Sequence, residues 1–102
     1  LIMFVVVASL TLHVPESHSL KAKRRVVRSL VERIRARFDV SVAETGGQGS
    51  WQSATIGVAC VSGSAEMAED VVGRVLAFVD SSSAEFEVVE QHVEVLSGSD
   101  SA

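Results

Sequence analysis

Hydrophobic and polar positions along the chain follow two periods, and each period predicts a kind of element. Residues 3–14 and 38–43 alternate with a period of two, which is typical of strands with one buried face. Residues 54–61 are apolar on both parities, as in a central strand, and 86–96 form a last predicted strand. Apolar residues recur at helical spacing from Leu20 to Phe38, and again at 68–79.

The order of these elements predicts an α+β fold of the ferredoxin-like type, β-α-β-β-α-β. Right-handed crossovers would place the first strand between the third and the fourth, and both helices on one face of a four-stranded antiparallel sheet. A length of 102 residues fits one domain. We expect this domain at 1–96 and a disordered tail at 97–102.

Composition excludes several classes of protein. A hydrophobic fraction of 47% is too high for intrinsic disorder, and the single Cys60 cannot build a disulfide scaffold. The apolar run 1–12 is shorter than the ~20 residues of a membrane-spanning helix, and its β-branched valines favour a strand. We therefore expect a cytoplasmic protein with no membrane partner.

Charge is strongly segregated, although the formal net charge is only −4. Segment 21–37 holds a single acid, Glu32, and eight of the nine basic residues: Lys21, Lys23, Arg24, Arg25, Arg28, Arg33, Arg35 and Arg37. For the last three arginines we expect pairing with acids at the start of the second helix, which should run antiparallel to the first. Those acids are Glu66, Glu69 and Asp70.

The cations at the start of the first helix call for another explanation. The helix dipole disfavours each of them there by ~0.3–1 kcal/mol, whereas bound anions are favoured at that end. The pattern therefore predicts a phosphate-binding site, and structured RNA or a ribosomal particle as the partner. Its members would be Ser17, Ser19, Lys21, Lys23, Arg24, Arg25 and Arg28. The alternative is that these cations make structural or oligomer contacts.

A second function class starts from the uncovered face of the sheet. Met3, Val5 and Val7 share the parity of Ser9 and Thr11 and should emerge on that face, with Trp51 beside them or just beyond the rim. We expect a homo-oligomer through this face, forming a ligand- or protein-binding module with no nucleic-acid role. A tryptophan that plugs the hairpin is the alternative for Trp51.

The candidate catalytic and metal-binding residues lack the spacing or the partner residues that such sites require. His13, Glu16 and His18 would lie on a bending loop with no regular spacing to aim them at a metal. Cys60 lies inside an apolar strand and has no CxxC partner. The loop 46–49 lacks the Lys-Ser/Thr of a phosphate-cradling motif. We expect no enzyme, no metal and no cofactor.

Three motifs resemble the YlxP-like family, which is defined by a domain of unknown function. They are His13-Val14-Pro15-Glu16-Ser17-His18-Ser19-Leu20-Lys21-Ala22-Lys23-Arg24-Arg25, Arg37-Phe38-Asp39-Val40-Ser41-Val42-Ala43-Glu44, and Trp51-Gln52 followed by Ala54-Thr55-Ile56-Gly57-Val58-Ala59. The resemblance implies a ferredoxin-like fold, a bacterial origin and gene neighbours in translation initiation and ribosome maturation. It brings no established activity and no catalytic residue. The Gly-rich loop 46–49 departs from relatives that are polar or acidic there.

Overall fold

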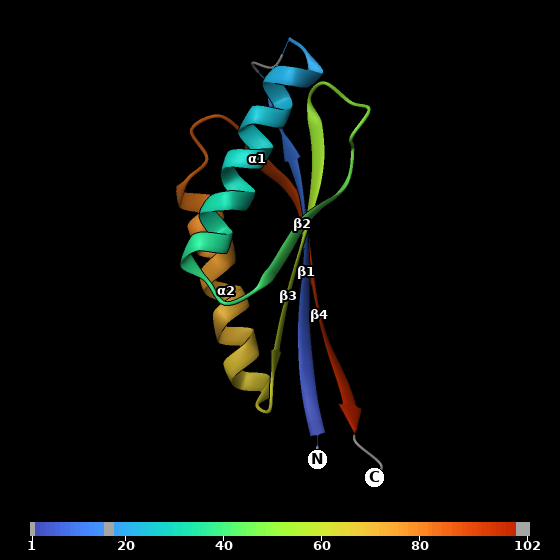
Figure 1. Ribbon diagram of the computed structural model, residues 1–102, viewed down its shortest axis with the longest axis vertical. Coiled ribbons are helices and arrows are strands. Elements are labelled where there is room, and N and C mark those ends of the chain that lie inside the picture. Colours follow the sequence, from blue (N-terminus) through green and yellow to red (C-terminus); the bar gives the residue numbers. More distant parts are fainter. Residues whose placement is uncertain (1, 16–17, 100–102) are drawn as a thin grey trace.

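A computed structural model describes residues 2–15 and 18–99 of the chain (Figure 1). The six elements follow the predicted order. They are β1 (Ile2–His13), α1 (Leu20–Arg37), β2 (Ser41–Gly46), β3 (Ser53–Ser62), α2 (Ala65–Ser81) and β4 (Glu87–Ser99).

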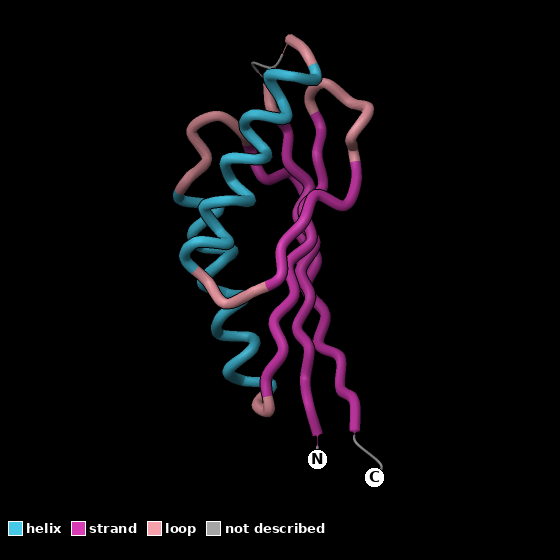
Figure 2. Tube along the Cα trace, viewed as in Figure 1, coloured by secondary structure: helices cyan, strands magenta, loops and turns pink. Residues whose placement is uncertain are grey.

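The four strands form one antiparallel sheet in the order β2-β3-β1-β4. Both helices lie on the same face of this sheet, and the other face is open (Figures 1 and 2). α1 packs mainly on β2, whereas α2 packs on β1 and β3. The ferredoxin-like fold and the central position of β1 are thus confirmed. The molecule is elongated, with extents of 52 × 24 × 21 Å.

The core lies between the helices and the alternate residues of the central strands. β1 contributes Val6, Ala8, Leu10 and Leu12, all of them buried. Ala54, Ile56, Val58 and Cys60 of β3 complete this surface, and the helices cover it with Val27, Leu30, Ile34, Ala68, Val72, Val75 and Val79. Each fully buried Val, Leu or Ile contributes ~1.5–3 kcal/mol. Because successive side chains of a strand point to opposite faces, the odd-numbered residues of β1 face the open side of the sheet.

Both helices begin at a serine cap. The Ser19 hydroxyl accepts a hydrogen bond from the Ala22 backbone N–H at 3.1 Å, and the Ser64 hydroxyl accepts one from that of Met67 at 3.2 Å. Such caps stabilise a helix by about 1 kcal/mol. Their first turns differ in charge, because α2 has Glu66 there and α1 has no acid. Neither helix of the described chain is long and apolar enough to cross a membrane.

Two element ends differ from the expectations. β2 begins at Ser41 rather than at Phe38, because Phe38 ends α1: its N–H donates to the carbonyl of Ile34 at 3.0 Å. β4 continues to Ser99, since the first residues of β1 offer partners as far as Ile2. Residues 97–99 therefore belong to the sheet rather than to a tail, and 100–102 lie outside the described residues.

Candidate anion-binding surface

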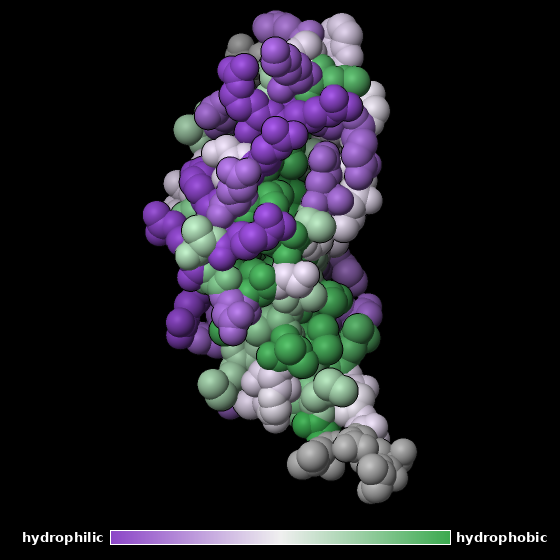
Figure 3. Space-filling model, in the orientation of Figure 1, coloured by the Kyte–Doolittle hydropathy of each residue, from purple (hydrophilic) through white to green (hydrophobic). Residues whose placement is uncertain are grey.

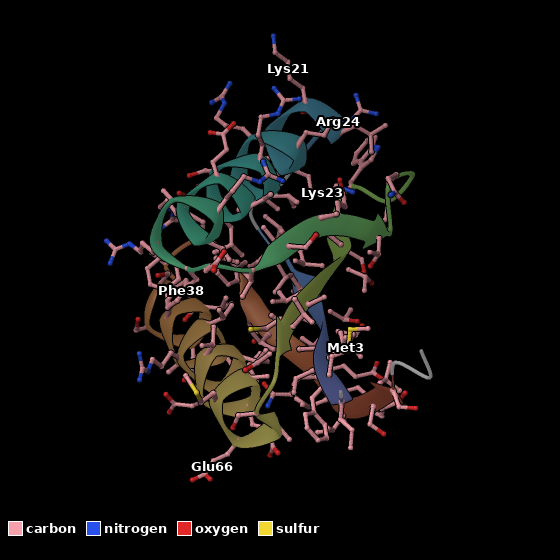
Figure 4. The ribbon with its side chains drawn as sticks, turned by 60° about the horizontal axis from the view of Figure 1, so that its bottom comes forward. Met3, Lys21, Lys23, Arg24, Phe38 and Glu66 are labelled. Atoms are coloured by element: carbon pink, nitrogen blue, oxygen red, sulfur yellow. The ribbon has the colours of Figure 1, made fainter. Side chains whose placement is uncertain are left out.

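Four cations near the start of α1 form one continuous surface, which we call the basic surface: Lys21, Arg24, Arg25 and Arg28. Their spacing of three, four and seven residues places them on one side of the helix. All four are exposed, and they line a shallow hollow of about 440 Å³ together with Ser29 and Glu32. Figure 4 shows Lys21 and Arg24 at the outer end of the molecule, far from Glu66.

No described carboxylate forms an ion pair with the basic surface. The ion pairs of the described chain are Lys23–Glu44, Arg74–Asp70 and His92–Glu94. Glu32 lines the same hollow, so four cations face one carboxylate there. The basic surface consequently has positive charge to spare for an external anion.

A second hollow, of about 400 Å³, lies between α1 and β2 and shares Arg24 and Arg28 with the first. Arg35 also lines it, but its Nη2 donates to the carbonyl of Val42 at 3.0 Å. Glu44 is the carboxylate of this second hollow. Arg24 and Arg28 therefore occupy the centre of the cationic region, and each can face either hollow.

Lys23 is not part of this surface, and its predicted role in anion binding is wrong. Its side chain is 0% exposed; its Nζ donates to the carbonyls of Gly47 at 2.6 Å and Ser53 at 3.1 Å, and lies 3.8 Å from Glu44 Oε2. The helical spacing gives the reason. Lys23 precedes Val27, Leu30 and Ile34 by four, seven and eleven residues, which places it on the buried face.

Lys23 instead holds the loop between β2 and β3 against α1. Its two carbonyl partners, Gly47 and Ser53, lie at the two ends of that loop. Gly47 has a φ of +80°, and a Cβ there would lie 2.7 Å from the Ser53 oxygen, so the loop requires glycine. Figure 2 shows this loop and the start of α1 at the same end of the molecule.

The expected pairing between the two helices is also wrong for the described residues. Arg33, Arg35 and Arg37 contact, in that order, the carbonyl of Ser29, the carbonyl of Val42 and the ring of Phe78. Asp70 pairs with Arg74 on its own helix. The helices are antiparallel but offset along their axes, because Phe38 at the end of α1 packs on Phe78 near the end of α2. Glu66 therefore lies at the far end of α2 from Phe38 (Figure 4).

The structure separates Trp51 from the other predicted interface residues. Met3 is exposed, and Val5 and Val7 are half-buried, on the open face. Trp51 is 58% exposed in the β2–β3 loop, where the N–H of Val14 donates to the carbonyl of its neighbour Gln52 at 2.8 Å. The length of β1, about 33 Å over ten residues, lies between the two places. Trp51 is thus not a hairpin plug, and it lies at the basic end of the sheet.

The remaining candidates give no further site. Ser17 and Glu16 lie outside the described residues, and Ser19 acts as the cap of α1. Within 2–15 and 18–99, no group of three or more histidine, cysteine or acidic side chains is placed to hold a metal. Cys60 is buried, with its thiol 3.9 Å from the carbonyl of Val61.

Comparisons with known proteins give the family of the chain and supply no activity. Residues 5–93 match the family model described as "Protein of unknown function (DUF503)". The uncharacterised protein YlxP of Bacillus subtilis (strain 168) is 42% identical over 66 residues, which cover 65% of this chain and 72% of that protein. The de novo designed protein Foldit4 is similar with a TM-score of 0.49 and 20% identity, over 95% of this chain and 98% of its own. The chain belongs to the DUF503 family of proteins of unknown function.

Proposed function

We propose that this protein is a non-catalytic, cytoplasmic factor that binds the phosphates of structured RNA, such as that of a ribosomal particle, through the basic surface. The observation that supports this is the cluster of exposed Lys21, Arg24, Arg25 and Arg28, which has no ion pair with a described carboxylate. Arginine and lysine are the side chains that neutralise phosphates, and arginine binds them bidentately.

The position of the cluster on α1 adds to the argument. Lys21 lies in the first turn of α1, where the positive end of the helix dipole makes a cation unfavourable by ~0.3–1 kcal/mol unless an anion is bound. Backbone N–H groups at a helix start also favour phosphate. The cationic side chains, the helix dipole and the backbone N–H groups all favour a negatively charged ligand. A polyanion is therefore the ligand that fits this surface.

The rest of the fold restricts how RNA would bind. Base stacking on the open face is disfavoured, because the described residues of β1 and β3 present Ser9, Thr11, Thr55 and Gly57 there, with no phenylalanine, tyrosine or tryptophan. Glu90 and Glu94 of β4 would repel phosphates on the same face. We therefore expect RNA to contact the α1 side of the molecule, with recognition of backbone shape rather than of sequence.

The test compares two variants with the same change in net charge. One is Lys21→Glu/Arg24→Glu/Arg25→Glu on the basic surface, and the other is Arg33→Glu/Arg37→Glu/Arg74→Glu elsewhere. Binding to a labelled RNA hairpin is followed by fluorescence anisotropy over a range of salt concentrations. Each lost phosphate contact should reduce the slope of log K against log salt by ~0.7–0.9.

We expect the first variant to lose most of its affinity and two to three units of slope, at about 0.7–0.9 per contact. The second variant should keep the wild-type slope, because none of its three arginines lines the hollow of the basic surface. Circular dichroism must show that both variants are folded. Equal binding by the two variants would refute the proposal, since it would assign the interaction to overall charge.

The second candidate is an oligomeric, protein-binding module at the open face. Val61 and Leu96 flank Val5 in register across β3, β1 and β4, and they are 63% and 45% exposed. Figure 3 shows hydrophobic side chains over the lower half of the sheet and hydrophilic ones over α1. A nucleic-acid-free oligomer that Val5→Lys dissociates in gel filtration would favour this candidate. A wild-type protein that elutes at the monomer mass would exclude the oligomer.

A further inference from the structure

β4 is an edge strand with few of the features that usually protect an edge. It lies outermost in the sheet, pairs with β1 on one side, and has no described strand on the other. Twelve of its thirteen residues are exposed. It contains no proline and no lysine, and its one irregularity is the bulge beside Val89. Glu87, Glu90 and Glu94 are the protective side chains that it does carry, but a long exposed edge can still pair with another strand.

Both faces of β4 contribute apolar surface at this edge. Val93 and Val95 pair with the buried Ala8 and Val6, so they point to the helix side. They stay 43% and 44% exposed, because α2 packs over β1 and β3 and hardly extends to β4. Leu96 pairs with Val5 and points to the open side. A strand added at this edge would cover valines on one face and a leucine on the other.

We propose that the edge of β4 binds a second copy of this chain, with the two β4 strands antiparallel about a two-fold axis at Val93. The two sheets would then join into one continuous eight-stranded sheet. Residues 90–96 form the ladder, since the bulge beside Val89 ends regular pairing on one side. In this register His92 faces Glu94 of the other copy twice, Glu90 faces Leu96, and Gln91 faces Val95.

The glutamates of β4 favour this register over those with the two-fold axis at a neighbouring residue. With the axis at Glu94, two carboxylates would face each other, and with the axis at His92, Glu90 would face Glu94 twice. Like charges directly opposite on neighbouring strands are destabilising, and the axis at Val93 avoids both of these arrangements. An axis between two residues is excluded, because it would bring helix-side positions opposite open-side positions. His92 Nε2 lies 3.6 Å from Glu94 Oε1 of its own strand, so both side chains are on the open face of the sheet.

The expected dimer is reversible rather than permanent. A seven-residue antiparallel ladder adds about six to eight backbone hydrogen bonds. Seven residues on each side are far fewer than the about 20–30 of a standard-size interface. Self-association should therefore depend on protein concentration. The proposal does not rest on RNA binding, because α1 and the basic surface lie over β2, at the opposite edge of the sheet.

Engineered cysteines test both the edge and the register. In Val93→Cys the two thiols lie on the axis, with Cα atoms about 4.5–5.5 Å apart, as a disulfide requires. In Val95→Cys the same residue of the other copy is four residues along the ladder, about 13 Å away, which is beyond disulfide reach. Both variants are oxidised and analysed by non-reducing electrophoresis. The wild type, with its buried Cys60, is the control.

We expect a disulfide-linked dimer from Val93→Cys only. The variant His92→Glu in that background should slow the cross-link, because it places two carboxylates opposite each other, and His92→Glu/Glu94→Lys should restore it by giving this pair opposite charges. Val5→Lys on the open face should leave the rate unchanged. Equal cross-linking of Val93→Cys and Val95→Cys, or of neither, would overturn the proposal whatever the result of the RNA experiment.

Discussion

Replacing Lys23 with methionine tests whether the buried ammonium group of Lys23 holds the β2–β3 loop against α1. Methionine keeps most of the apolar stem, so the substitution removes the ammonium group and its two hydrogen bonds with little change in packing. The carbonyls of Gly47 and Ser53 would lose their donor, and the carboxylate of Glu44 would lose its ion-pair partner. The substitution therefore leaves two acceptors and one charge without compensation.

The magnitude follows from those lost contacts. Hydrogen bonds to a charged group contribute ~1.5–3 kcal/mol each, and removing one partner of a buried pair costs ~3–5 kcal/mol. The Glu44 side chain is 24% exposed, although its Oε2 beside Lys23 is buried, so we take the lower end and expect a loss of about 3 kcal/mol. A domain of this size has about 5–15 kcal/mol of stability in all, and loses about 4–8 °C of Tm per kcal/mol. The variant should still fold, with a Tm lower by roughly 12–24 °C.

Urea unfolding followed by far-UV circular dichroism measures this loss. Lys21→Met is the matched control, because Lys21 is exposed on the same turn and its substitution should change the stability by less than about 0.5 kcal/mol. Adding Glu44→Gln to Lys23→Met should recover part of the loss by removing the unpaired charge. Equal stability of the Lys23→Met and Lys21→Met variants would refute the buried role of Lys23.

Three further predictions concern the same end of the molecule. Gly47→Ala should destabilise the protein by about 1–3 kcal/mol in urea unfolding, because its φ is positive and its Cβ would meet the Ser53 oxygen. Ser19→Ala should cost about 1 kcal/mol in the same assay, since it removes the cap of α1. The emission of Trp51, the sole tryptophan, should change on RNA binding, because Lys23 holds its loop beside the basic surface. A titration in which RNA binds and the emission stays constant would contradict that last prediction.

Much of the fold could be predicted because buried apolar residues recur in the sequence with the period of a strand or of a helix. In β1 the alternation around Leu10 and Leu12 gives the buried face directly. The chirality of the two crossovers then gives the strand order without any knowledge of contacts. Element ends were less predictable. Phe38 is compatible with either a strand or a helix end, and its backbone N–H, which donates to the carbonyl of Ile34, places it at the end of α1.

The candidate site was less predictable, because composition does not tell which lysine is buried. Lys23 looks like its basic neighbours, and the acceptors that satisfy it are backbone carbonyls of Gly47 and Ser53, about 24 and 30 residues away. The helical spacing to Val27 and Ile34 was the available signal, and it outweighs residue type. The failed pairing of Glu66 has a different cause. An antiparallel arrangement fixes the relative direction of two helices. It does not fix how far one helix is shifted along the other, because that shift depends on side-chain packing.

The two edges of the sheet explain how a chain with a net negative charge can present a basic surface. The cations of α1 lie over β2, whereas Glu87, Glu90 and Glu94 lie on β4 at the opposite edge. Exposed charges separated by more than the Debye length, about 8 Å in physiological salt, are largely screened from each other. β2 and β4 are separated by three strand spacings of about 4.8 Å each, or about 14 Å, which exceeds the Debye length. The proposed RNA contact and the proposed strand pairing therefore use different edges, and neither surface needs the other to form.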